Sequence, residues 1–465
     1  MKKQLILILT LVLLVGVTAG ILLIVNNMET EQKAEKERLE QEKILVSLNS
    51  NDIDRIELLS DGEEYIAVLD ENGKWTLENE VDFEINTYYL NSLASQLSTL
   101  TADEVICPVD GANLSDYGLD APTTITLCAD ETTYIINVGE LSATGEFYYV
   151  TIDGRDKVFG VSADYADFLN ANKSSLKSIY ILRNSDSPVT AVSLEAHGEI
   201  VYDLTMNEDK LWLLNEPVAL TDRVDTSGVN TLLTNISQMI VDRFGEEYVT
   251  EDQYAELGFD DPAYIFRFQQ ENGETTTLLV QDYDLESTSF VSLLCKETGQ
   301  AFQMESTYTD FLHDEPDQFI QNIIYSCPIS EIESIKIDWT EREKADIYID
   351  EENGKYELNG TALDGNEEAV IALENFYTKI QALKYDVLIP ENPTEADAEP
   401  EITITYTKMD GTSTEITFCE ADEENLAVFA DGEYSYFTIS KKNFTARDGI
   451  YDYYDQLLNA AGIEK

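Results

Sequence analysis

Hydrophobic residues follow two alternating periodicities along most of the chain. Ile53–Leu58 and Tyr65–Leu69 alternate apolar and polar side chains, and this period of two predicts strands. Apolar residues then recur at helical spacing, and the stripe that they form consists of Leu90, Leu93, Leu97 and Leu100. A helix with one apolar stripe buries that stripe against a sheet, so the pattern predicts an α+β fold.

Turn signals separate these elements. Asn72-Gly73 predicts a tight hairpin into a strand at Lys74–Leu77, because both central residues of such a turn need positive φ. Asn86 is the expected N-cap of the helix. After a turn at Tyr117–Pro122, we expect four strands and a short helix, at Thr124–Cys128, Thr133–Val138, Phe147–Ile152, Lys157–Val161 and Asp164–Leu169.

The same order of elements returns twice. Trp75 in the first hairpin is followed 137 residues later by Trp212, and Pro122 is followed 140 residues later by Pro262. A third, divergent copy has Tyr356 in its hairpin. Since self-similarity at a fixed period indicates tandem repeats, we predict three modules of antiparallel strands, one long amphipathic helix and a β-meander. Their expected bounds are 51–180, 187–325 and 329–462.

An apolar run at residues 5–25 precedes the repeats. Its 21 residues reach about 30 Å as a helix, which is the thickness of the hydrocarbon core of a bilayer. Lys2 and Lys3 lie in the tip, residues 1–4, and favour a cytoplasmic N-terminus. The alternative is a signal peptide cleaved after Ala19, but Ile21–Val25 continues the apolar run past that site. Residues 26–48 are expected to form a charged helical stalk or linker.

Either alternative places the repeats outside the cytoplasm. The predicted localisation is therefore the cell membrane, with a single span at residues 5–25 and an extracytoplasmic body.

The charge of the chain is concentrated in the predicted repeats. The formal net charge is −62, and residues 1–50 contain equal numbers of acidic and basic side chains, so residues 51–465 carry all of it. This field repels nucleic acid and anionic lipid head groups, which excludes DNA or RNA as a partner. A content of 43% hydrophobic residues with 26 tyrosines is typical of a folded body. Weak association of Ca²⁺ or Mg²⁺ with the acidic surface is expected.

The five cysteines are spread widely and are odd in number. Neither a disulfide framework nor a zinc site has this pattern, and we interpret the residues as small buried hydrophobes. One bridge stays open as an alternative, and Cys107–Cys128 is then the least implausible pair.

Most candidate chemistry in the sequence has a plain structural explanation. His197 and His313 have no His or Cys neighbours at ligand spacing and are interpreted as surface residues. Ser174-Ser175-Leu176-Lys177 matches a nucleophile motif of penicillin-binding enzymes, but the partner motifs are missing. Asp70–Gly73 and Asp350–Gly354 lack the oxygen spacing of a calcium loop and are interpreted as hairpin turns.

Trp75 and Trp212 are expected to be core aromatics beneath the helices, with a sugar-stacking platform as the alternative. We therefore predict no catalytic, cofactor-binding or metal-binding residues. Gly118 and Gly258, which precede prolines in the repeated turns, are interpreted as architectural.

The chain resembles a known bacterial family, the domain of unknown function 4340. The features that carry this resemblance are the Gly-Lys-Trp hairpin, the leucine-striped helix, the Tyr117–Pro122 turn and Gly139-Glu140, behind an N-terminal anchor. The resemblance implies an accessory role in the cell envelope, near ABC-type exporters related to gliding-motility proteins. It implies no established activity, ligand or catalytic residue.

The leading functional hypothesis is a non-catalytic extracytoplasmic scaffold or binding accessory of an ABC-type export system. One alternative is a stand-alone cell-surface module that binds glycans or peptides through exposed tyrosines. A third is a hydrolase with an unrecognised carboxylate site.

Overall fold

A computed structural model describes residue 26 and residues 32–79, 81–183, 186–221, 223–285, 287–340, 342–395 and 398–464. The predicted cytoplasmic tip at residues 1–4 and the membrane span at residues 5–25 lie outside the described residues. Within the described part of the chain, no helix is long and apolar enough to cross a membrane.

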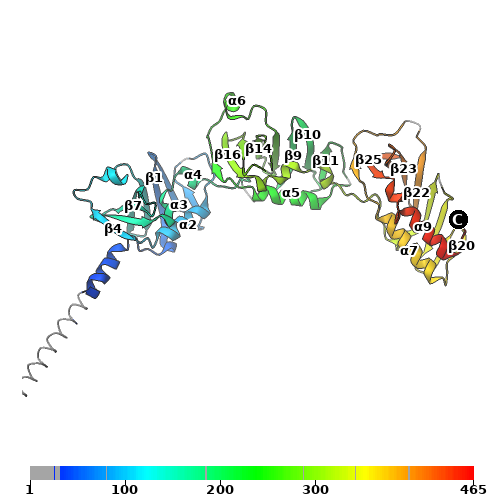
Figure 1. Cartoon of the computed structure of the whole chain (residues 1–465), viewed down its shortest axis with the longest axis horizontal. Helices are drawn as coiled ribbons and strands as arrows, with labels where there is room; N and C mark the ends of the chain where they lie inside the picture. Colours follow the sequence, from blue (N-terminus) through cyan, green and yellow to red (C-terminus); the bar gives the residue numbers. More distant parts are fainter. Residues whose placement is uncertain are drawn as a thin grey trace, which may run out of the picture. The chain divides into compact units, whose positions relative to one another are not determined.

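The described chain divides into a first compact unit that ends at Ile179 and a second that begins at Tyr180. The first unit contains one antiparallel sheet and the second contains two (Figure 1). The predicted combination of helices with antiparallel sheets and repeated strand units is confirmed. The exact bounds of the three repeats stay a prediction.

The three sheets share one strand order. The first sheet runs β3-β2-β1-β5-β6-β7-β8-β4, and the second runs β11-β10-β9-β13-β14-β15-β16-β12. The third runs β20-β19-β18-β17-β22-β23-β24-β25-β21 and so adds one edge strand. In each sheet the first strand (β1, β9 or β17) pairs both with the next strand in sequence and with the second strand after the long helix (β5, β13 or β22). A local hairpin and a long-range pairing therefore meet inside the sheet.

The first unit has most of the predicted elements. Its strands are β1 (Ile53–Ser60), β2 (Glu63–Leu69), β3 (Trp75–Leu77), β4 (Glu104–Pro108), β5 (Thr123–Ala129), β6 (Thr132–Leu141), β7 (Phe147–Ile152) and β8 (Lys157–Ser162). Its helices are α2 (Thr87–Leu97), α3 (Ala166–Leu169) and α4 (Lys173–Leu176). As predicted, Asn86 is the N-cap of α2, and its side chain accepts a hydrogen bond from the backbone N–H of Tyr89.

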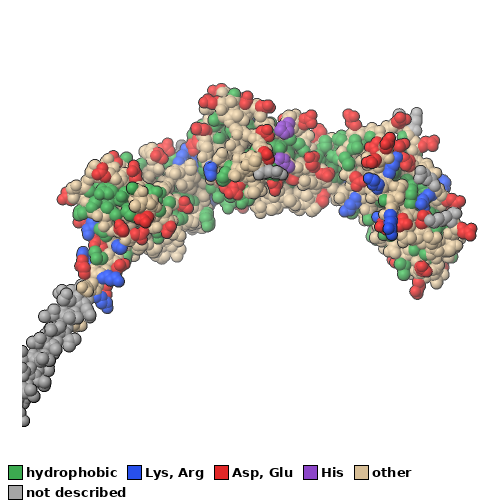
Figure 2. Space-filling view, viewed as in Figure 1, with side chains coloured by type: hydrophobic (Ala, Val, Ile, Leu, Met, Phe, Trp, Pro, Cys, Tyr) green, Lys and Arg blue, Asp and Glu red, His purple; other side chains and the backbone are tan. Residues whose placement is uncertain are grey.

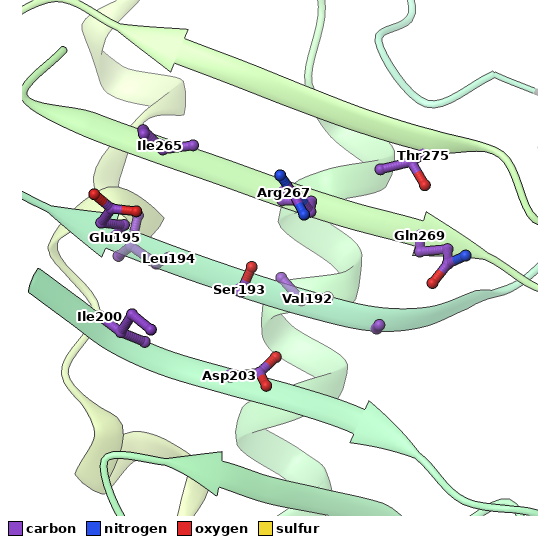
Figure 3. A pocket seen from close by; sticks show the side chains of 11 residues that line it. Val192, Ser193, Leu194, Glu195, Ile200, Asp203, Ile265, Arg267, Gln269 and Thr275 are labelled. Carbon is purple, nitrogen blue, oxygen red and sulfur yellow. The ribbon is translucent and has the colours of Figure 1, made fainter. Parts of the chain in front are cut away.

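The second sheet repeats this order. Its strands are β9 (Val189–Ala196), β10 (Glu199–Met206), β11 (Trp212–Glu216), β12 (Arg243–Phe244), β13 (Tyr264–Gln270), β14 (Thr275–Val280), β15 (Phe290–Cys295) and β16 (Gln300–Glu305). Its helices are α5 (Thr226–Gln238) and α6 (Tyr254–Leu257). Helix α5 lies across one face of the sheet, as Figures 1 and 3 show.

Among the described residues, the third sheet is accompanied by two long helices, whereas each of the other sheets has one. Its strands are β17 (Ile332–Trp339), β18 (Ala345–Asp350), β19 (Lys355–Leu358), β20 (Thr361–Ala362), β21 (Val387–Leu388), β22 (Pro400–Lys408), β23 (Ser413–Glu420), β24 (Asn425–Ala430) and β25 (Glu433–Ser440). Its helices are α7 (Glu367–Gln381), α8 (Lys442–Thr445) and α9 (Ile450–Ala461). The divergent copy thus keeps the full topology.

The predicted stalk is helical over residues 32–43. Arg38 forms an ion pair with Glu35 at 2.9 Å on this helix, as the spaced charges suggest. The helix is not free of the first unit, because Glu42 pairs with Lys157 of β8. Leu45 and Val46, which follow the helix, are fully buried in the core of that unit. The end of the predicted stalk is therefore part of the folded body.

Each sheet is covered by its helix on one face. Leu90, Leu93 and Leu97 of α2 share one buried cluster with inward-facing strand residues such as Ile56 and Leu127. Val229, Leu232 and Ile236 of α5 are buried in the same way in the second unit. The opposite face of each sheet carries the polar half of the alternation, and it is on this face that the candidate site lies.

Candidate functional site

The outer face of the second sheet contains a hollow of about 410 Å³. Strands β10, β9, β13 and β14 form its floor and walls, while α5 lies behind the sheet (Figure 3). We call it the β9 hollow. The side chains that reach into it are polar or charged, apart from two isoleucines at one end, and they are Ser193, Glu195, Asp203, Arg267, Gln269, Thr275, Ile200 and Ile265.

The hollow exists because the central strand presents small residues. Ala191 and Ser193 of β9 point to the outer face, whereas Val192 and Leu194 are buried on the helix side. On one side, Ser193 is paired with Arg267 of β13, and on the other side with Asp203 of β10. Longer side chains on both flanks of a short one leave a trough between them.

Opposite charges form the two walls of the β9 hollow. Asp203 is oriented by Asn215, whose side-chain amide donates to Asp203 Oδ2 at 3.2 Å and to Thr205 Oγ1 at 3.0 Å. Arg267 is exposed, and no other described residue forms a hydrogen bond or an ion pair with its guanidinium. Two strand spacings separate these residues, which corresponds to about 10 Å between their backbones. Asp203 and Arg267 are therefore not cross-strand neighbours, and they stand on opposite sides of the central strand β9.

The equivalent position in the other sheets carries a long charged side chain. The hairpin aromatics Trp75, Trp212 and Tyr356 pair with Leu69, Met206 and Ile349, which places the three sheets in a common register. In this register, Ser193 corresponds to Glu57 in β1 and to Lys336 in β17.

In the first sheet, the side chain at that position is held by a neighbour. Glu57 accepts a hydrogen bond at 2.7 Å from Arg55, which stands at the position of Ala191. The trough over the central strand is thus filled by an ion pair in the first sheet, and it is open in the second.

A second feature of the outer face is the repeated turn that the sequence pointed to. In the second sheet, Phe259 and Leu257 of this turn pack with Leu279 and Leu294 in a small separate cluster. This cluster covers the outer face of β14 and β15 and leaves the β9 hollow open. In the first sheet Leu119 is likewise buried.

The glycines of this turn have a steric role. Gly118 has φ +66°, and a Cβ there would lie 2.7 Å from the backbone nitrogen of Glu140. Gly258 has φ +78°, where its neighbour is the side chain of Gln281. The architectural interpretation of both glycines is therefore supported by their backbone conformation.

Both histidines of the chain lie beside one tyrosine of the second unit, which sequence reasoning missed. The ring of Tyr264 is 5.8 Å from that of His197 and 5.5 Å from that of His313. The histidine side chains lie close together in Figure 2. His313 lies between two hydroxyls. The hydroxyl of Tyr264 is 3.3 Å from Nδ1 of His313, and the hydroxyl of Tyr283 is 3.2 Å from Nε2 of His313.

Nothing in the local sequence signals this histidine arrangement, because its four residues come from four separate segments. Burial raises the pKa of the Tyr264 and Tyr283 hydroxyls, so both stay protonated hydrogen-bond donors or acceptors. Burial also raises the pKa of Asp314, next to His313. In the described part of the chain, no group of three or more His, Cys, Asp or Glu residues is arranged to hold a metal ion.

The remaining sequence candidates have structural roles. Trp75 and Trp212 are buried, and the Trp75 indole donates to Asn91 of α2 at 2.8 Å, so the prediction that they are core aromatics is confirmed. Lys177 of the Ser-x-x-Lys match is buried over the ring of Phe83.

The two acidic segments considered as calcium loops are turns of hairpins. Asp70 accepts the backbone N–H groups of Asn72 and Lys74, each at 2.8 Å, between β2 and β3. Asp350 accepts from Asn353 in the equivalent turn. The hairpin interpretation is confirmed for both.

All five cysteines are free thiols. Cys107 contacts the hydroxyl of Tyr117 and Cys128 that of Thr133, so the bridge left open for this pair does not form. Cys327 and Cys419 are buried as predicted, and the other three are partly exposed.

Comparisons with known proteins identify one family. The sequence profile described as "Domain of unknown function (DUF4340)" matches three overlapping segments, residues 18–122, 75–252 and 212–402. No curated protein and no solved structure matches the chain.

Proposed function

The chain belongs to the DUF4340 family, and from its tandem architecture we propose that it is an extracytoplasmic scaffold that serves an ABC-type export system of the cell envelope. In this proposal, residues 5–25 form a single membrane span with a cytoplasmic N-terminus. The sheets then lie in the aqueous space beyond the lipid.

The observation that carries this proposal is the threefold repetition of one sheet-and-helix unit. In each copy the long helix covers one face of the sheet, and polar residues lie on the other face, as in β9 and its equivalents. Tandem copies of one module offer the same kind of polar face more than once, and engagement of a partner at several linked points raises the overall affinity. The dense acidic surface in Figure 2 keeps such a body soluble and away from anionic lipid.

The partner assignment is tested by recovery from membranes. The full-length chain with a C-terminal affinity tag would be purified from gently solubilised membranes of its own host, and co-purified proteins would be identified by mass spectrometry. The proposal expects enrichment of ABC transporter subunits over a tagged single-pass protein of unrelated sequence. Recovery of the chain at good yield with no transporter subunit contradicts it.

A stand-alone binding module is the second candidate function, and the β9 hollow favours it. Several tyrosines are well exposed, including Tyr88 at 79% and Tyr248 at 58%, and in this candidate function they stack on the ligand. Retention of the full chain on purified cell-wall material, with no transporter in the pull-down, would select this candidate over the first.

A further inference from the structure

We propose that the β9 hollow is a binding site for a short peptide that carries one basic and one acidic side chain. The proposal concerns the second sheet alone and does not depend on the membrane location or on an export partner.

Opposite charges on the two sides of the hollow favour a ligand that carries both signs. Arg267 supplies a planar guanidinium with no partner among the described residues, and such a group prefers a bidentate carboxylate. On the other side, Asp203 of β10 supplies a carboxylate that favours an ammonium or guanidinium, and Glu195 of the central strand β9 adds a second carboxylate at the isoleucine end. A ligand with a single charge satisfies one wall only, whereas a zwitterionic ligand satisfies both.

Uncharged polar groups line the hollow between the charges, and apolar side chains line one end. Ser193 and Thr275 offer hydroxyls, and Gln269 offers an amide, which suit the polar backbone of an extended peptide. Ile200 is 55% exposed at the end next to Glu195 and Ile265, so an aliphatic part of the ligand finds an apolar contact there. The described residues that line the hollow include no aromatic ring, which disfavours a stacked sugar.

The groups that form the hollow are held in place before a ligand binds. Asn215 holds Asp203 by a hydrogen bond, and the two walls stand on strands that pair with β9 directly at Ser193. A group held in place by the sheet loses little conformational freedom on binding. The filled trough of the first sheet, with its Arg55–Glu57 pair, shows the closed alternative of the same architecture.

Calorimetric titration of the full-length chain in detergent micelles tests the proposal. The probe is the blocked tripeptide acetyl-Lys-Ala-Glu-amide, and two matched probes replace either Glu or Lys with Gln. We expect binding of the first probe and a roughly tenfold or greater loss with each Gln probe, since each lacks one charge-assisted contact. Equal affinity for all three probes, or no binding of any, overturns the proposal. An N-acetylglucosamine tetramer that binds where the peptides do not also overturns it.

Variants locate the binding in the hollow. Ser193→Lys places in the hollow the residue that the third sheet carries as Lys336, so the fold tolerates it, and binding of the Lys-Ala-Glu probe is lost. Arg267→Gln abolishes the preference for the Lys-Ala-Glu probe over the probe in which Gln replaces Glu. The affinity for that Gln-substituted probe is unchanged. Asp203→Asn weakens binding roughly tenfold, whereas Asp346→Asn, the same change at the equivalent position of β18, has no effect. Unchanged binding by Ser193→Lys, with an unchanged circular dichroism spectrum, refutes the assignment.

Discussion

The α-carbon of Gly139 lies so close to the carbonyl oxygen of Tyr117 that a Cβ on residue 139 would overlap that oxygen. The Tyr117–Pro122 turn and the Gly139-Glu140 pair are thus two halves of one contact, although they are separated in sequence. The second sheet makes the equivalent contact differently, because Gln281 stands near the turn and its side-chain amide donates to the carbonyl of Leu257 at 2.5 Å. Both solutions hold the turn on the outer face of the sheet.

Gly139→Ala is expected to destabilise the first unit by roughly 1–3 kcal/mol, because the added methyl group forces the turn off the sheet. Hydrogen exchange of the full chain, followed by mass spectrometry, measures this in peptides from the first unit. Gly145→Asn is the control, since nothing lies within 4 Å of that position and Asn tolerates its φ of +75°. The steric explanation is wrong if both variants change protection equally.

Trp75→Phe is expected to lower the free energy of unfolding more than Trp212→Phe does, although the two residues occupy equivalent places. Both changes remove the same volume from a buried position, but only Trp75 donates to a helix residue, Asn91. The difference should be about 1 kcal/mol, the usual net value of one hydrogen bond. Hydrogen-exchange protection in the first unit measures the effect of Trp75→Phe, and protection in the second unit measures the effect of Trp212→Phe. A larger loss for Trp212→Phe would contradict the assigned role of the Asn91 contact.

The stability of the first unit should fall as the pH rises from 10 to about 12. Burial raises the pKa of Tyr89 to about 12, above its ordinary value of 10, and its hydroxyl donates to the carbonyl of Asp167 at 2.8 Å. A folded-state pKa above the unfolded value means that the stabilisation is fully present below pH 10. It is lost as the pH rises towards the folded pKa, by on the order of 3 kcal/mol.

Tyr89→Phe cannot ionise, so its first unit should show a shallower decline over the same range. Urea unfolding followed by circular dichroism at pH 9, 10 and 11 would compare the two proteins. Parallel declines would show that other tyrosines account for the effect.

Added salt should raise the melting temperature. With a formal net charge of −62, the folded chain repels itself, and the Debye length falls from ~30 Å at about 0.01 M to ~3 Å at about 1 M ionic strength. Calorimetric scans in NaCl and in CaCl₂ at matched ionic strength separate screening from specific binding. We expect similar midpoints in both salts, with a small excess in calcium from diffuse association. A large calcium-specific rise would reveal ion sites that the hairpin interpretation of Asp70–Gly73 denies.

Local patterns predicted the strands and helices that alternate or stripe clearly. The Asn86 cap, the stripe of α2 and the meander strands β5 to β8 all follow from periodicity and turn chemistry within a short window. The edge strand β4 (Glu104–Pro108) was missed because it shows no clear alternation and forms only by pairing with β8. The two-residue strands β12 and β21 are stabilised in the same way, by a partner far along the chain.

The site depended even more on tertiary structure. Nothing in the segment around Ser193 indicates a hollow, because the hollow arises from Arg267 and Asp203 on neighbouring strands. The sequence predicts each histidine only as a separate surface residue, because their common neighbour Tyr264 comes close to both only once the sheet is assembled. By contrast, the burial of Trp75 and Trp212 followed from their repeated place in a hairpin beneath a helix.

The extracytoplasmic position of the repeated body, on a single membrane anchor, is the proposal on which the scaffold role depends. It is tested most directly by adding a non-permeant protease to intact, wall-stripped cells that express the chain with a C-terminal tag, with a cytosolic protein as the control for leakage. With the body outside the cytoplasm, we expect the tag and the body to be digested while the cytosolic control survives. Full protection of the body in intact cells, with digestion only after lysis, would contradict it.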